Sequence, residues 1–182
     1  MSTPEAAHSP PAPIPAPLAW VGDGAPRMEV AHIETTRPHL MAYGTQLGAS
    51  YELRYWLEVE SLRLELVGER RVELELGEAD FFDLGWSPLF NSVPVLRDGL
   101  LGAGPPREYR MCWVNVPSLA VSTSQQRYEP IGDGLVAFEA GDFSAAIEFD
   151  DAGFVLNYPG IAVRVPTSGR PLPGRRAASD ET

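Results

Sequence analysis

Apolar and charged residues alternate along several short stretches of the chain, and a period of two is typical of β-strands. In Leu62–Leu66 and Val72–Leu76 the apolar positions are separated by charged ones, as expected for strands with one face in water. Gly68 and Glu69 lie in the connection between them. The two stretches therefore predict an antiparallel hairpin.

Further strands are expected on both sides of this hairpin, separated by turns rich in Gly and Asp. They cover residues 29–33, 39–44, 53–59, 108–116, 119–123, 135–139, 143–149, 154–158 and 161–165. About ten strands with short connections favour an all-β, single-domain fold, in which a meandering antiparallel sheet curls to hide its edges. The result is a spiral β-roll or half-open barrel, whose interior either is filled by side chains or holds one small ligand.

The two ends of the chain have a different composition. Residues 1–17 hold six of the eighteen prolines, and residues 167–182 are rich in Pro, Gly, Arg and Ala without apolar periodicity. We expect a disordered Pro-rich tail over 1–17, a β-roll domain over 18–166 and a second disordered tail over 167–182. The first residues contain no basic segment followed by an apolar run, so a cytoplasmic location is expected.

The stretch Phe81–Arg97 combines the most aromatic area with two prolines and isolated polar groups. It predicts a buried strand with an apolar surface and a few fixed polar points, at Asp83, Asn91 and Arg97. Trp86 stands between Gly85 and Ser87-Pro88 in an expected loop, where packing alone gives less reason for a large ring.

The end of this stretch has two interpretations. If the strand continues, its alternation places Val93, Val95 and Arg97 on one face, and an inward guanidinium must meet an acidic group, backbone carbonyls or an anionic ligand group. If it stops earlier, Arg97 and Asp98 form the polar start of a turn at Gly99.

Charge and composition exclude several classes of function. The formal net charge of −11 makes nucleic acid an unexpected partner, and no apolar run reaches the roughly 18 residues of a membrane span. The three histidines have no metal-ligand spacing, and no Gly-x-Ser-x-Gly motif occurs. Cys112, the single cysteine, is expected as an inert thiol inside a strand. The sequence therefore predicts a non-enzymatic protein without metal or cofactor.

Four parts of the sequence, taken in order, resemble the bacterial "Putative glycolipid-binding" family. They are residues 80–97, 116–121 with 126–128, 143–155, and 158–161 with 164–165. The resemblance extends from about Leu18 to Pro166. It implies a spiral β-roll similar in fold to the periplasmic lipoprotein carriers, with a concave side that takes acyl chains. The chain departs from the family pattern where Leu96 replaces one of two adjacent basic residues, which weakens the case for a two-arginine clamp.

These observations define a predicted function and a predicted site. We expect a binder of a glycolipid or similar amphipathic ligand in the concavity of the roll, with no cofactor. The alternative is a protein–protein interaction module with a filled core, which uses an edge strand or the Pro-rich tail. The sequence leaves the oligomeric state open. The candidate ligand-binding residues are Arg97, Asn91, Trp86, Asp83, Tyr158 and Arg164.

Overall fold

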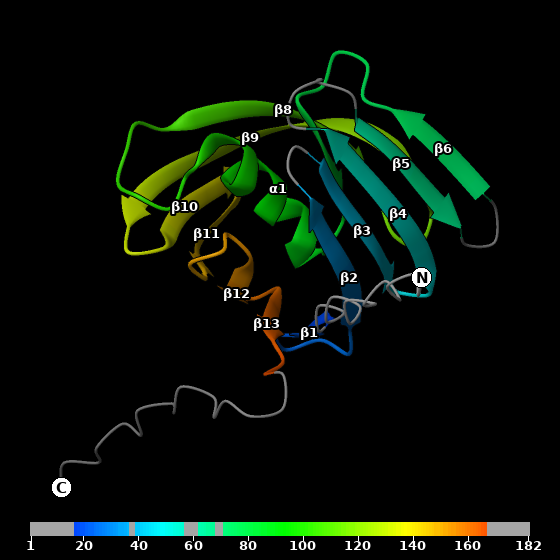
Figure 1. The fold of residues 1–182 in the computed structure, drawn as a ribbon, viewed down its shortest axis with the longest axis horizontal. Coiled ribbons are helices and arrows are strands. Elements are labelled where there is room, and N and C mark those ends of the chain that lie inside the picture. Colours follow the sequence, from blue (N-terminus) through cyan, green and yellow to red (C-terminus); the bar gives the residue numbers. More distant parts are fainter. Residues whose placement is uncertain (1–16, 37–38, 57–61, 68–70, 167–182) are drawn as a thin grey trace, which may run out of the picture.

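The computed structural model describes residues 17–36, 39–56, 62–67 and 71–166 (Figure 1). The described residues form thirteen strands of one sheet and a helix, α1. The strands are β1 Leu18–Gly22, β2 Met28–Thr36, β3 His39–Gln46, β4 Ala49–Trp56, β5 Leu62–Val67, β6 Arg71–Glu75, β7 Phe81–Leu84, β8 Arg107–Val114, β9 Val121–Gly132, β10 Leu135–Ala140, β11 Phe143–Phe149, β12 Val155–Tyr158 and β13 Ala162–Arg164. The predicted tails lie outside the described residues, apart from Pro17, so the domain limits stay a prediction.

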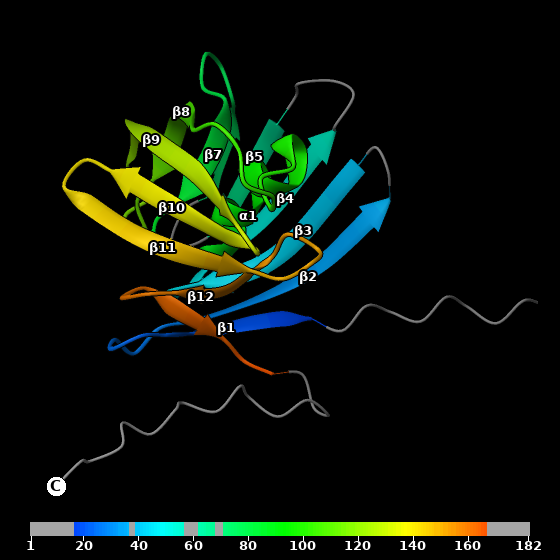
Figure 2. The ribbon, with the colours of Figure 1, turned by 90° about the vertical axis from the view of Figure 1, so that its left-hand side faces the viewer.

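The strand order shows how the two halves of the chain form one sheet. It runs β6-β5-β4-β3-β2-β1-β13-β12-β11-β10-β9-β8-β7, with β1 and β13 joining the halves in antiparallel register at Trp20 and Arg164. Twist curls the sheet around a concave side, and β7 comes back to contact β5 (Figure 2). The sheet does not close, because β6 and β7 remain its two ends. The predicted all-β curled sheet is confirmed.

Most strands lie where the alternation predicts them, but β1 was not expected and β9 continues to Gly132, well beyond the expected strand. The hairpin of β5 and β6 is antiparallel, with Leu66 opposite Val72. The expected strand at 119–123 was placed too early, because Leu119 lies in a turn with φ of 56° and β9 begins at Val121. One pair departs from the expected antiparallel arrangement, since β7 and β8 are parallel.

The strand predicted across Phe81–Arg97 was wrong beyond Leu84, because α1 spans Pro88–Asp98. Pro88 occupies the first helical turn, where its missing N–H costs nothing. Gly99 ends the helix in the left-handed region, with φ of 68°, and its N–H donates to the Val95 carbonyl oxygen at 2.9 Å. In a helix, residues two apart point in different directions, so the proposed common face of 93, 95 and 97 does not exist. A helical connection also explains the parallel β7–β8 pair.

Helix α1 lies on the concave side of the sheet, between its two halves (Figures 1 and 2). Every residue from Pro88 to Val95 is buried. The Phe90 ring meets the Tyr51 ring edge to face at 5.4 Å, and the Ser92 hydroxyl oxygen accepts the Val155 N–H at 3.1 Å. Strands β4 and β12 thus both pack on the helix. This part of the concave side is therefore core, filled by α1.

Candidate functional site

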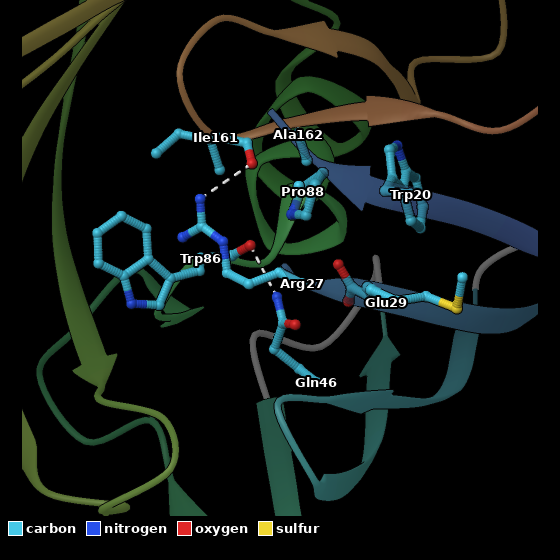
Figure 3. Close-up of a pocket in the computed structure, with 10 residues that line it drawn as sticks. Trp20, Arg27, Glu29, Gln46, Trp86, Pro88, Ile161 and Ala162 are labelled. Atoms are coloured by element: carbon cyan, nitrogen blue, oxygen red, sulfur yellow. Dashed lines mark hydrogen bonds between the residues drawn. The ribbon is translucent and has the colours of Figure 1, made fainter. Parts of the chain in front are cut away.

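A small crevice opens where several connections meet beside α1 (Figure 3). Its walls come from the β1–β2 hairpin, the end of β3, the turn before α1 and the β12–β13 turn. The lining residues are Trp20, Gly22, Arg27, Met28, Glu29, Gln46, Trp86, Pro88, Ile161 and Ala162. The empty space is about 160 Å³, part of it open to solvent, and the crevice is too narrow to enclose a water molecule in this conformation.

Trp86 forms the exposed rim of the crevice. It lies in the turn between β7 and α1, as the sequence predicts for a loop, and 47% of its surface is exposed. Its φ is 68°, in the left-handed region that bulky side chains rarely adopt. The Gln46 side-chain Nε2 donates to the Trp86 carbonyl oxygen at 2.7 Å and thereby holds this backbone. A backbone conformation of this kind is unfavourable and persists only where surrounding contacts hold it. Such residues cluster at ligand sites.

Arg27 lies against Trp86 and forms the same boundary of the crevice. Its guanidinium carbon lies 4.4 Å from the centre of the Trp86 ring, within the range of a cation–π contact. Its Nη2 donates to the Ile161 carbonyl oxygen at 3.2 Å. The Arg27 Nε, in contrast, is buried without a hydrogen-bond partner.

Glu29 is a buried carboxyl group at the base of the crevice, with 2% of its surface exposed. Its Oε1 accepts hydrogen bonds from the Tyr51 hydroxyl and the Ser87 hydroxyl, both at 2.7 Å. Burial raises the pKa of Glu29 to about 7, although these two bonds and the Leu89 amide of α1 oppose the rise. The Glu29 Oε2 has no partner at hydrogen-bond geometry. The group therefore changes charge near neutral pH while one oxygen remains unpaired.

The unpaired polar atoms of the described residues converge on this crevice. Three buried side-chain atoms have no hydrogen-bond partner there: Arg27 Nε, Glu29 Oε2 and Gln46 Oε1. All three residues line the crevice. A buried polar group without a partner costs about 1–3 kcal/mol, so such groups rarely persist without a reason. A ligand that reached these atoms would offer them hydrogen-bond partners.

The sequence analysis did not identify Arg27, Glu29 or Gln46. Glu29 and Gln46 are register partners on β2 and β3, which brings their side chains together. The sequence contained one weak signal: in the expected strand 29–33, Glu29 alternates with Ala31 and Ile33, so a carboxyl group shares a strand face with apolar residues.

Three predicted site residues come together elsewhere, in a buried network between α1 and the sheet. The Asn91 side chain donates to the Tyr128 hydroxyl at 3.0 Å, which donates to Gln126 Oε1 at 3.1 Å. Gln126 Nε2 donates to the Asp83 carboxylate. Burial raises the pKa of Asp83 to about 7, opposed by the Gln126 bond. Burial and the nearby Asp83 charge also raise the pKa of Tyr158. Asn91 and Asp83 are therefore joined through Tyr128 and Gln126, Tyr158 lies near Asp83, and none of the three lines the crevice.

The two predicted arginines occupy separate positions. The Arg97 guanidinium lies 3.9 Å from the centre of the Phe81 ring, and its Nε donates to Asp98 at 2.8 Å. The Tyr109 hydroxyl donates to the same carboxylate. Burial acts to raise the pKa of Asp98, but the bonds from Arg97 and Tyr109 outweigh it and lower the value. Arg164 pairs with Asp150 at 2.7 Å. A ligand-binding role for either arginine stays a prediction.

Other chemistry finds little support in the part of the chain that the structure describes. It contains no group of three or more His, Cys, Asp or Glu residues placed to hold a metal ion. Cys112 is half-buried inside β8, as predicted, and burial raises the pKa of its thiol. This disfavours the reactive thiolate. No helix in the described ranges is long and apolar enough to cross a membrane.

The chain is similar to known proteins in sequence and in fold. A crystal structure of a DUF1089 family protein from Pseudomonas aeruginosa matches 90% of this chain and 100% of its own, with a TM-score of 0.56 and 17% identity. At this identity the match supports the fold alone. No curated protein matches the sequence significantly. The profile of a protein family described as "Putative glycolipid-binding" matches residues 65–164, more than half of the chain. The protein therefore belongs to the "Putative glycolipid-binding" family.

Proposed function

We propose that this protein binds a glycolipid-like amphipathic ligand, and that the crevice beside Trp86 holds its polar head. The convergence of three unpaired buried polar atoms on one crevice carries this proposal. A few fixed polar groups beside an aromatic side chain are typical of small-molecule sites. The family description supports the ligand class. The proposed position differs from the concavity expected from the sequence, because α1 fills that side.

The surface around the crevice suits the apolar part of such a ligand. Met28, Trp86 and Val21 are exposed large apolar residues on adjoining segments, with 58%, 47% and 39% of their surfaces in contact with solvent. An acyl chain leaving the crevice over the Trp86 ring would remove apolar area from water. Met28 and Val21 are register partners on the face of β1 and β2 opposite to Trp20 and Glu29, so they would not contact that part of the acyl chain. The polar head would thus contact hydrogen-bonding groups, while the apolar chain would contact an exposed aromatic ring.

Ligand entry requires a local movement. The crevice is too narrow for a water molecule, and the stacked side chains of Arg27 and Trp86 form one of its boundaries. An exposed cation–π contact stabilises by only about 0.5–1 kcal/mol. Movement of the Trp86 ring alone separates the pair and keeps the hydrogen bond from Arg27 to Ile161, so its cost is small compared with the hydrogen bonds that a polar head would form.

We expect octyl β-D-glucoside, used below its micelle-forming concentration, to bind saturably to the full chain. Trp86→Ala should weaken this binding at least tenfold, because the variant removes the aromatic wall. Isothermal titration calorimetry measures the affinity without relying on tryptophan emission. Ile131→Ala is the matched control, since Ile131 is 54% exposed and does not line the crevice.

The same titration has two outcomes that contradict the proposal. One is a wild-type protein that shows no saturable binding. The other is equal affinity in wild type and Trp86→Ala, with circular dichroism spectra that agree. The alternative role as an interaction module stays a prediction.

A further inference from the structure

We infer that the crevice selects an uncharged head group rich in hydroxyl groups and discriminates against anionic and cationic heads. This inference rests on the proposed function and concerns the same site. It follows from the kinds of hydrogen-bonding atoms that the crevice leaves unpaired, and from the charges that lie around them.

The unpaired atoms comprise one donor and two acceptors. Arg27 Nε–H is the donor, and Glu29 Oε2 and Gln46 Oε1 are the acceptors. The orientation of Gln46 is fixed, because its Nε2 already donates to the Trp86 carbonyl oxygen. A complementary head must therefore offer at least two donors and one acceptor within a small space.

Neighbouring hydroxyl groups of a sugar ring meet this requirement, since each both donates and accepts. At pH 8, above the raised pKa of Glu29, the carboxyl group is ionised and accepts only. A phosphate or sulfate also accepts and has little or nothing to donate, so it would leave Glu29 Oε2 and Gln46 Oε1 without partners. An ammonium head donates hydrogen bonds but has no acceptor for the Arg27 Nε–H. The exposed Trp86 face adds a flat surface on which the C–H side of a sugar ring packs.

The charges around the crevice act in the same direction. Glu29 is buried at its base, and the Tyr51 and Ser87 hydroxyls that face the carboxyl group are bound to Oε1. An anionic head would approach this carboxylate in surroundings of low dielectric constant. The Arg27 cation attracts an anion, but its guanidinium is already bound to the Ile161 carbonyl oxygen and stacked on Trp86. The same cation repels an ammonium head.

Three probes with the same octyl chain test this inference by calorimetry at pH 8: octyl β-D-glucoside, octyl phosphate and octylamine. The wild-type chain should bind the glucoside at least tenfold more tightly than either charged probe. Glu29→Gln replaces the carboxylate with a neutral amide that also donates. It should therefore strengthen binding of octyl phosphate at least tenfold, with a smaller change for the glucoside.

Glu34→Gln is the matched control, because Glu34 is an exposed residue of the same strand and does not line the crevice. It should leave the preference among the three probes unchanged. A melting curve establishes that Glu29→Gln is folded, and if it is not, the ratio of affinities in wild type decides alone.

The outcomes separate this inference from the proposed function. Equal wild-type affinity for glucoside and phosphate overturns the selectivity and leaves the binding site in place. Absence of binding for all three probes overturns the proposed function itself. A folded Glu29→Gln protein that still discriminates against phosphate as wild type does would contradict the role given to Glu29.

Discussion

Replacing Phe90 with alanine is expected to lower the free energy of unfolding by about 3–5 kcal/mol, the range for deletion of a fully buried ring. Phe90 is 1% exposed and meets the Tyr51 ring edge to face across the concave side. The sheet around α1 cannot collapse into the space that the ring leaves without moving the helix. Urea denaturation followed by circular dichroism measures the loss.

Ile131→Ala provides the comparison, because a surface position of this kind changes stability by about 0.5 kcal/mol or less. If Phe90→Ala destabilised the protein by under about 1 kcal/mol, α1 would not be part of the core. The concave side would then be open to a ligand in solution, as the sequence analysis expected.

The protein should become less stable as the pH rises from 5 to 8. Burial raises the pKa of Glu29 from 4.5 to about 7 and that of Asp83 from 3.8 to about 7. At a pH between the unfolded-state and folded-state pKa values, the folded protein keeps protons that the unfolded chain has released. The stability present at low pH is therefore lost as the pH approaches 7. Over the interval from pH 5 to 8 each group accounts for roughly 2–3 kcal/mol of this loss, since one unit of pKa corresponds to 1.36 kcal/mol. The lowered pKa of Asp98 acts only in more acidic solution.

Glu29→Gln should remove about 2–3 kcal/mol of this pH dependence and leave the Asp83 part. The amide has the same shape, and its oxygen accepts from Tyr51 and Ser87 as the carboxyl does. Urea denaturation at pH 5 and pH 8 gives the values, with Glu34→Gln as the exposed control. A stability that is flat or rises over this interval in the wild-type protein would show that neither carboxyl group is held as described.

The sheet was predictable because alternation follows directly from the pleat of a strand. The β5–β6 hairpin has the expected pattern and register, and most other strands start within a few residues of their expected positions. Helix α1 was not predicted, because it is buried on almost all sides and therefore lacks an apolar stripe at a period of 3.6 residues. Its valines favoured a strand and its second proline, Pro94, disfavoured a helix, although Pro88 and Gly99 are typical start and stop signals.

The site was less predictable than the sheet. Trp86 was identifiable, because local residues mark its turn and a large ring there has few packing reasons. Arg27, Glu29 and Gln46 were not, because the crevice depends on the register of β2 with β3 and on where α1 begins. Asp83 and Asn91 stood out as isolated polar groups within an apolar stretch, and their role in ligand binding stays a prediction. Their shared network through Tyr128 depends on distant pairing that no local pattern contains.

The position of the bound head group is the central claim, and nuclear magnetic resonance of the ¹⁵N-labelled protein tests it most directly. During titration with octyl β-D-glucoside, the account predicts that the Trp86 indole, the Gln46 side-chain amide and the Arg27 Nε–H signals shift together. The Asn91 side-chain amide, which bonds to Tyr128 on the concave side, should stay where it is. Shifts at Asn91 with unchanged signals from Trp86 and Gln46 would place the ligand against α1 and contradict the account.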